Sequence, residues 1–266
     1  MLLDVKHLTK RFGGLTAVSS IDLAVKPGEV RGIIGPNGSG KSTLFNLISG
    51  VYKPEPGGSV VFDGDDITGG EPHDVARHGV ARTFQLLRIF SGMSVLENLL
   101  IGHHGLIRYD TASAVVGSRK VWAEERRVRE EMMQLLSFIG LTDYADMPAA
   151  ELSGGQRRLL ALGRAMAMRP KLLMLDEPAA GLSPVNVDLL LDTVLALKHR
   201  FGLTVIIIEH ILKVVMETCE TVSVLDHGEK IAEGSPAAIK EDHRVIEAYL
   251  GKEMEDSEVR ALLRSA

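Results

Sequence analysis

Apolar residues in the N-terminal part of the chain fall in short runs separated by turn residues. The runs are rich in β-branched and aliphatic residues, which favours strands, and Pro27-Gly28 and Asp63-Gly64 mark turns between them. A helix that begins near Lys41 is expected to end near Gly50, because glycine readily adopts the left-handed conformation that closes a helix. Strands are predicted over residues 15–18, 21–25, 30–34 and 60–62, the last of them in a hairpin.

The pattern after residue 170 alternates between strand and helix. Ser183 and Pro184 are typical of the N-cap and the first position of a helix, which is expected to run to about residue 200. A further helix is predicted over residues 211–219, and strands over residues 172–175, 204–208 and 222–225. Because strands that alternate with helices usually lie parallel, this half predicts a mostly parallel sheet covered by helices.

A helical segment separates these two β-rich parts. Between residues 122 and 139, apolar residues recur at the spacing of one helical face, while the opposite face is charged. We therefore expect a single domain over residues 1–266, with a helical subdomain inserted at residues 86–158 and a helical tail at residues 240–266. The apolar positions are Val128, Met132, Leu135, Leu136 and Ile139.

A glycine-rich segment between the strand at residues 30–34 and the following helix matches the phosphate-binding pattern G-x-x-x-x-G-K-[ST]. Its glycines let consecutive backbone amides point at phosphate oxygens, and the helix adds its positive N-terminal end. Lys41 supplies a cation for the β- and γ-phosphates, and the Ser42 hydroxyl is a ligand for Mg²⁺. The segment predicts a nucleoside triphosphate site formed by Gly35, Asn37, Gly38, Ser39, Gly40, Lys41, Ser42 and Thr43.

Two adjacent carboxylates, Asp176 and Glu177, follow the strand predicted at residues 172–175. An aspartate at the carboxyl end of a parallel strand, beside a phosphate loop, is placed to hold the Mg²⁺ shell. The neighbouring glutamate can then act as the general base that activates water for attack on the γ-phosphate. The pair therefore favours an ATPase, and the lack of an N-K-x-D stretch argues against guanine specificity.

A second phosphate-binding surface is predicted at residues 152–156, Leu-Ser-Gly-Gly-Gln. Ser153 is expected to cap a helix whose first turn contains Gly154 and Gly155, so that no side chain blocks its amides. One ATP does not need two phosphate cradles from one subunit. We therefore expect two copies of the protein to face each other head to tail, with each nucleotide shared between them.

Composition and charge limit the class of protein. With 45% apolar and 24% charged residues in 266, the chain has the composition of an ordinary globular protein, and its net charge of −5 argues against a nucleic-acid partner. Cys219 is the sole cysteine, so no internal disulfide can form. The longest apolar run is shorter than the about 18 residues of a membrane span, and the first residues lack the order of a signal peptide, so a cytoplasmic protein is expected.

The order of these motifs resembles that of the nucleotide-binding subunits of ATP-binding cassette (ABC) transporters, over residues 2–250. Leu-Ser-Gly-Gly-Gln is similar to the signature sequence of that superfamily. The resemblance implies an α/β fold of the P-loop NTPase (RecA-like) type: a mostly parallel sheet, an N-terminal antiparallel β subdomain and an α-helical insertion. It also implies that a partner subunit supplies Ser153, Gly154, Gly155 and Gln156 to the nucleotide.

Three further positions match motifs of the same family. Gln85 fits its glutamine loop, which implies a Mg²⁺ contact beside those of Ser42 and Asp176. His210, at the end of a predicted strand, fits the switch histidine and implies a catalytic role with Glu177 and Lys41. Phe12 stands where the family more often has a tyrosine that stacks on adenine, and stacking requires only the ring.

A narrower resemblance points to the ATPases of branched-chain amino acid importers. It is carried by residues 12–18, 81–85, 93–98, 177–182 and 247–251. Most cassette ATPases have an aspartate at the position of Ser183, and the branched-chain group also lacks it. The residue that replaces this aspartate in contacts between subunits is left open.

The resemblance implies an ATP-hydrolysing motor that works with ATP and Mg²⁺, a second ATPase subunit, identical or not, and transmembrane permease subunits. The protein would then lie on the cytoplasmic face of the inner membrane, with apolar Leu86, Leu87, Ile89 and Phe90 exposed to a permease. Branched-chain amino acids are the expected cargo, with urea, other amino acids or lipid as alternatives. A DNA-repair type ATPase is disfavoured, because Leu152 follows Gln85 by only 67 positions, too few for a long coiled coil. A soluble kinase gives the signature segment no role.

Overall fold

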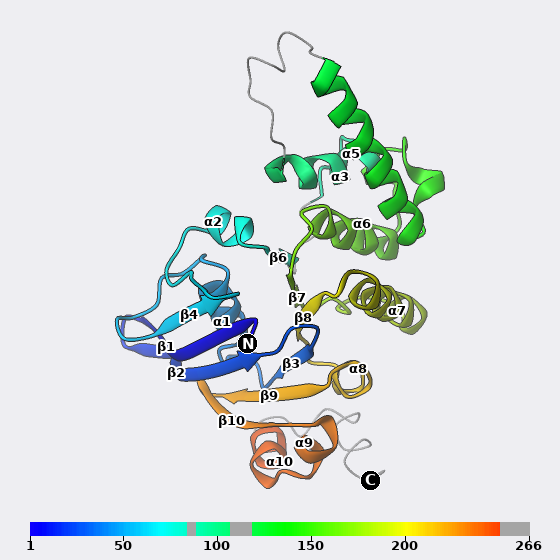
Figure 1. Cartoon of the computed structure of the whole chain (residues 1–266). Helices are drawn as coiled ribbons and strands as arrows, with labels where there is room; N and C mark the ends of the chain where they lie inside the picture. Colours follow the sequence, from blue (N-terminus) through cyan, green and yellow to red (C-terminus); the bar gives the residue numbers. More distant parts are fainter. Residues whose placement is uncertain (84–88, 107–118, 251–266) are drawn as a thin grey trace. The chain divides into compact units, whose positions relative to one another are not determined.

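A computed structural model describes residues 1–83, 89–106 and 119–250 of the chain. The chain divides into two compact units (Figure 1). The first unit contains Met1–Arg82, Lys171–Ala180 and Val194–Ala266, and the second contains Thr83–Pro170 and Gly181–Thr193.

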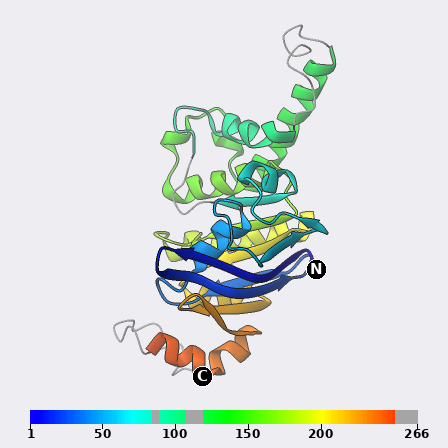
Figure 2. The ribbon, with the colours of Figure 1, turned by 90° about the vertical axis from the view of Figure 1, so that its left-hand side faces the viewer.

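The first unit begins with an antiparallel sheet in the order β2-β1-β4-β5. Strands β1 and β2 form one long hairpin, with Leu3 opposite Val25 and Phe12 opposite Leu15, and they lie side by side in Figure 2. The hairpin predicted at residues 60–62 and the Asp63-Gly64 turn is confirmed by the pairing of β4 with β5, whereas the two runs predicted at residues 15–18 and 21–25 form one continuous strand. The strands are β1 (Leu3–Phe12), β2 (Leu15–Val25), β4 (Ser59–Phe62) and β5 (Asp65–Asp66).

A second sheet in this unit has the order β10-β9-β3-β8-β7-β6. Strands β3, β7, β8 and β9 are parallel, and every residue of β3, β7 and β8 is buried, which confirms the predicted mostly parallel sheet. Strand β10 runs antiparallel to β9 at one edge. The strands are β3 (Val30–Ile34), β6 (Val80–Thr83), β7 (Leu172–Asp176), β8 (Thr204–Ile208), β9 (Thr221–Asp226) and β10 (Glu229–Gly234).

Helix α1 (Lys41–Ile48) joins the cores of the two sheets. Its buried residues Leu44, Phe45 and Ile48 belong to one apolar cluster that also contains residues of β1 and β2 from the first sheet and of β7 and β8 from the second. The helix ends two residues before Gly50, whose φ of 77° is left-handed as expected. This packing fixes the start of α1, and thereby the glycine-rich loop that precedes it.

The remaining helices of the first unit lie at its surface. Ser235 caps α9, and α9 and α10 lie beside β10 in Figures 1 and 2. The predicted C-terminal tail is described only as far as α10, and residues 251–266 lie outside the described part. The helices are α2 (Pro72–Arg77), α8 (Leu212–Thr218), α9 (Pro236–Glu241) and α10 (His243–Leu250), while α7 (Pro184–Phe201) begins in the second unit and ends in the first.

The second unit is helical. The predicted apolar face is confirmed in α5, because Val128, Met132, Leu136 and their neighbours are buried. None of the described helices of the chain is both long and apolar enough to cross a membrane. The elements are α3 (Val95–His103), α5 (Arg119–Phe138), α6 (Gly154–Met166) and three 3₁₀ turns, η1 (His104–Leu106), η2 (Thr142–Tyr144) and η3 (Ala149–Glu151). The subdomain boundaries at residues 86 and 158 stay a prediction.

Candidate active site

The glycine-rich loop runs from the end of β3 to the first residue of α1. Gly40 is the residue before the helix and has a φ of 101°, and a Cβ atom there would collide with the carbonyl oxygen of Ala17. A Cβ atom on Gly35 would likewise collide with the carbonyl oxygen of Leu225. Only glycine fits at these two positions, so the loop packs against its neighbours more closely than any side chain would allow.

Lys41 folds back over the loop. Its Nζ donates to the carbonyl oxygens of Gly35 at 2.7 Å and Pro36 at 2.9 Å, and lies 3.4 Å from the Oγ of Ser39. Burial lowers the pKa of Lys41, and the charges of Glu177 and Asp176 oppose that shift. The structure thus brings the cation of the loop into the electrostatic range of both predicted carboxylates.

Other residues of the loop differ in their exposure. Ser39 is buried and helps to fix the loop, since its carbonyl oxygen accepts the backbone amide of Gly228 at 3.1 Å. Asn37, Gly38 and Ser42 are exposed, and Thr43 is half-buried. Ser42, next to Lys41, is an exposed residue whose hydroxyl could reach a ligand on the loop.

Asp176 ends β7 and forms a buried ion pair that the sequence did not reveal. Arg82 Nη2 donates to Asp176 Oδ2 at 2.7 Å, and the two side chains are only 9% and 8% exposed. The other terminal nitrogen of Arg82 donates to Asn46 Oδ1 at 2.6 Å and to Ser49 Oγ at 3.1 Å. Arg82 therefore ties the carboxylate to helix α1. The sequence shows Arg82 three residues before Gln85, but it does not predict that Arg82 pairs with Asp176.

Glu177 has an unusual backbone conformation. Its φ is 47°, a left-handed value that costs a residue with a side chain about 1–2 kcal/mol. Its amide donates to the carbonyl oxygen of Ile208 at 2.9 Å, which joins it to the end of β8. His210 follows the same strand two residues later, with its side chain 55% exposed. The structure thus places Glu177 and His210, two of the three predicted catalytic residues, at the carboxyl ends of the adjacent strands β7 and β8.

Phe12 lies at the end of β1 and is 43% exposed. The planes of the Phe12 and Tyr52 rings are 74° apart, with centroids 5.3 Å apart, and the Lys10 ammonium lies over the Phe12 ring at 5.6 Å from its centroid. The exposed part of the Phe12 ring is available for stacking on a flat ligand.

The signature segment lies in the second unit, at the start of α6. Ser153 caps this helix as predicted: its hydroxyl accepts the Gln156 amide at 3.3 Å, and its own amide donates to the Gln156 side chain at 2.9 Å. Gly154 is exposed, and a Cβ atom on Gly155 would lie 3.2 Å from the side chain of Asn186.

Some predicted positions are not described. Gln85 lies outside the described residues, as do Leu86 and Leu87. Of the apolar residues that follow them, Phe90 is 47% exposed, as expected, and its ring lies 5.5 Å from the guanidinium of Arg164, whereas Ile89 is half-buried.

Sequence comparisons match the chain to known families. Residues 18–180 match the family model of the ABC transporter, and residues 229–255 match that of the branched-chain amino acid ATP-binding cassette transporter. The high-affinity branched-chain amino acid transport ATP-binding protein BraF of Pseudomonas aeruginosa is 40% identical over 251 residues, which cover 94% of this chain and 98% of BraF.

Solved structures agree with these matches. The ADP conformation of MJ1267, an ATP-binding cassette of an ABC transporter, has a TM-score of 0.82 and 37% identity, and the match covers 94% of this chain and 99% of MJ1267. A dimeric structure of MJ0796, a bacterial ABC transporter cassette, has a TM-score of 0.73 and 26% identity, covering 88% and 98%. Both resemblances inferred from the sequence, and the fold that they imply, are thereby confirmed. The chain belongs to the ABC transporter family, among the ATP-binding cassettes of branched-chain amino acid transporters.

Proposed function

We propose that this protein is the ATP-hydrolysing motor subunit of an ABC importer for branched-chain amino acids. The observation that carries the proposal is the convergence of Lys41, Asp176 and Glu177 at the glycine-rich loop, in a chain whose relatives are transport ATP-binding proteins. The same convergence supports the predicted ATP site: adenine stacks on Phe12, and the phosphates lie on residues 38–43. Hydrolysis there is coupled to movement of a membrane partner.

The donor set at the loop fits Mg²⁺, which prefers oxygen ligands. Asp176 offers a buried carboxylate whose position Arg82 fixes, and Ser42 offers an exposed hydroxyl. We infer that these two residues hold the ion together with Gln85. When bound, Mg²⁺ supplies positive charge to the β- and γ-phosphate oxygens.

The chain's own residues then act on water and on the phosphate. Glu177 is the general base, because it follows the Mg²⁺-binding aspartate directly and lies close enough to Lys41 that its charge opposes the lowering of the Lys41 pKa by burial. Lys41 turns from the loop carbonyls to the γ-phosphate, and the exposed His210 orients the phosphate or the attacking water. A second copy contributes its Ser153, Gly154, Gly155 and Gln156 to the same nucleotide.

The test of hydrolysis is the substitution Glu177→Gln. We expect the turnover of ATP to fall by about 10²- to 10⁴-fold, the usual contribution of a general base, while the affinity for ATP stays close to that of the wild type. Glu229→Gln, an exposed position on β10, is the matched control. Wild-type turnover in the Glu177 variant would refute the assignment of the base.

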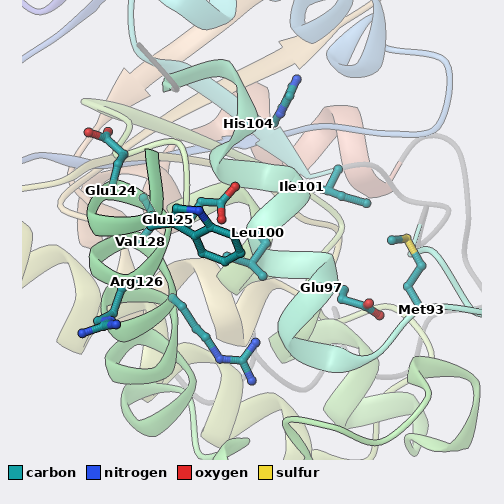
Figure 3. Close-up of a pocket in the computed structure, with 11 residues that line it drawn as sticks. Met93, Glu97, Leu100, Ile101, His104, Glu124, Glu125, Arg126 and Val128 are labelled. Carbon is teal, nitrogen blue, oxygen red and sulfur yellow. The ribbon is translucent and has the colours of Figure 1, made fainter. Parts of the chain in front are cut away.

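A pocket of about 920 Å³ in the second unit is the proposed docking surface for the permease. Figure 3 shows that side chains of α3 and α5 line it, and Trp122, which also lines it, is 64% exposed. An exposed indole on an apolar surface is typical of a protein interface. We infer that it receives a short cytoplasmic helix of a transmembrane permease subunit, and that the protein lies on the cytoplasmic face of the inner membrane. The pocket is lined by Met93, Glu97, Leu100, Ile101, His104, Trp122, Glu124, Glu125, Arg126, Val128 and Arg129.

Docking is tested with Trp122→Glu, compared with Trp122→Phe as the conservative control. The glutamate variant should lose copurification with the permease and should retain the ATPase rate of the isolated subunit. Undiminished copurification would exclude this pocket as the docking surface. The cargo is tested by measuring the ATPase rate of the intact transporter with binding proteins loaded with leucine or with urea. Stimulation by the leucine-loaded protein supports branched-chain amino acids, and stimulation by the urea-loaded protein alone supports another cargo.

A further inference from the structure

Glu209 is a buried carboxylate between the end of β8 and His210. Its side chain is fully buried, and its two oxygens accept backbone amides from two separate segments. Oε1 accepts the amide of Ala179 at 2.7 Å, and Oε2 accepts the amide of His210 at 3.2 Å. The Nδ1 atom of His210 lies 3.9 Å from Oε2.

These contacts join the two segments that carry the proposed catalytic residues. Ala179 is two residues beyond Glu177, in the turn closed by the amide of Ala180 on the Glu177 carbonyl oxygen at 3.2 Å. Together with the bond between the Glu177 amide and the Ile208 carbonyl oxygen, Glu209 attaches the left-handed turn to the end of β8 at two points. The Glu177 backbone therefore cannot relax to an ordinary conformation without breaking one of them.

Burying the charged form of the Glu209 carboxylate costs free energy. Burial raises the pKa of Glu209, while the amides of Ala179, His210 and Ile211 and the charge of His210 oppose that shift. Among the described residues, the groups that oppose the rise of the Glu209 pKa are backbone amides and one histidine, and none is a lysine or an arginine. An acceptor that binds backbone amides from two segments fixes the course of the main chain, which an ion pair between side chains would not.

We propose that Glu209 is a positioning residue for ATP hydrolysis, one that holds the turn of Glu177 and the backbone of His210 in a fixed relation. This inference rests on the proposed function, because it assumes that Glu177 and His210 act on the nucleotide. Glu209 itself is buried and acts through its neighbours. It aligns the base and the histidine without taking part in nucleotide binding.

The experiment compares Glu209→Gln with Glu217→Gln, an exposed position on α8 that serves as the control. Glutamine keeps the size of the side chain but turns an NH₂ group toward one of the two amides, which breaks that hydrogen bond. We expect kcat to fall about 10-fold or more, which corresponds to about 1.4 kcal/mol, while KM and the affinity for a fluorescent ATP analogue change less than about 2-fold. Amide hydrogen exchange at residues 177–180 should accelerate in this variant and not in the control.

A folded Glu209→Gln protein with wild-type kcat would overturn the inference, as would unchanged exchange at Ala179. If this variant does not fold, Glu209→Asp decides, because the shorter carboxylate cannot reach both amides: wild-type kcat overturns the inference, and reduced kcat with normal ATP affinity supports it. Glu177→Gln distinguishes a failure of Glu209 from a failure of Glu177. If Glu177→Gln leaves turnover intact, the proposed role of Glu177 as the base fails, and this inference fails with it. If Glu177→Gln abolishes turnover while Glu209→Gln keeps the wild-type kcat, only the role of Glu209 fails.

Discussion

Replacing Arg82 by methionine tests the buried ion pair at the end of β7. Methionine keeps much of the volume of the side chain but removes the guanidinium that lies 2.7 Å from the Asp176 carboxylate. The same change takes a donor from Asn46 and from Ser49. Because only 8% of the Asp176 side chain is exposed, water cannot easily replace the lost partner.

The expected loss of stability follows from this burial. Removing one partner of a buried ion pair costs about 3–5 kcal/mol, since the remaining charge stays buried without its hydrogen-bonded partner. Arg77→Met is the matched control, because the Arg77–Asp74 pair is 73% and 51% exposed and such surface pairs contribute about 0–1 kcal/mol. In the double variant Arg82→Met/Asp176→Asn, much of the loss should be recovered, because no unpaired charge remains.

Urea unfolding followed by far-UV circular dichroism measures the free energy of unfolding of each variant. We predict a lower midpoint for Arg82→Met, a near wild-type midpoint for Arg77→Met and an intermediate one for the double variant. A loss below about 1 kcal/mol in Arg82→Met would show that Arg82 does not compensate the Asp176 charge.

Three further predictions concern the loop, the cysteine and the ring. Gly40→Ala should lower the urea midpoint and abolish ATP binding, because its Cβ would collide with the carbonyl oxygen of Ala17. Gly38→Ala, whose Cβ would have no atom within 4 Å, should lower the midpoint and the ATP affinity less, and equal effects of the two variants would contradict the role of this collision. Burial raises the pKa of the Cys219 thiol to about 12, so a disulfide reagent at pH 8 should label the chain only after unfolding, and rapid labelling of the native protein would contradict that burial. Phe12→Leu should weaken ATP affinity several-fold in a fluorescence titration and Phe12→Trp should preserve it, since only the latter keeps a ring to stack; equal affinities would exclude stacking.

The sequence predicted those elements whose signal is local. The buried strands at residues 30–34 and 204–208 have the bounds expected from unbroken apolar runs, and the helix from Lys41 has the expected start. The long β1 strand and the edge strands β6 and β10 were not predicted individually. Strand β10 mixes charged and apolar residues, so its sequence does not favour a strand, and its pairing with β9 stabilises the extended conformation.

The site was predictable as far as its motifs are contiguous in sequence. The phosphate loop, the carboxylate pair and the Ser153 cap are each a short segment with a physical signature. Arg82 and Asp176 are 94 positions apart, and Ala179 and Glu209 are 30 apart, so their hydrogen bonds arise only when the strands assemble. The left-handed backbone of Glu177 is equally a product of tertiary structure.

The central claim is that one ATP is held between the glycine-rich loop of one copy and the Ser153 helix of another. Sedimentation of Glu177→Gln with and without ATP and Mg²⁺ tests this claim most directly. We predict a dimer that forms only with nucleotide and that is lost when Ser153→Arg is added. A protein that stays monomeric with bound ATP at high concentration, even beside its permease, would contradict the shared site and with it the motor function.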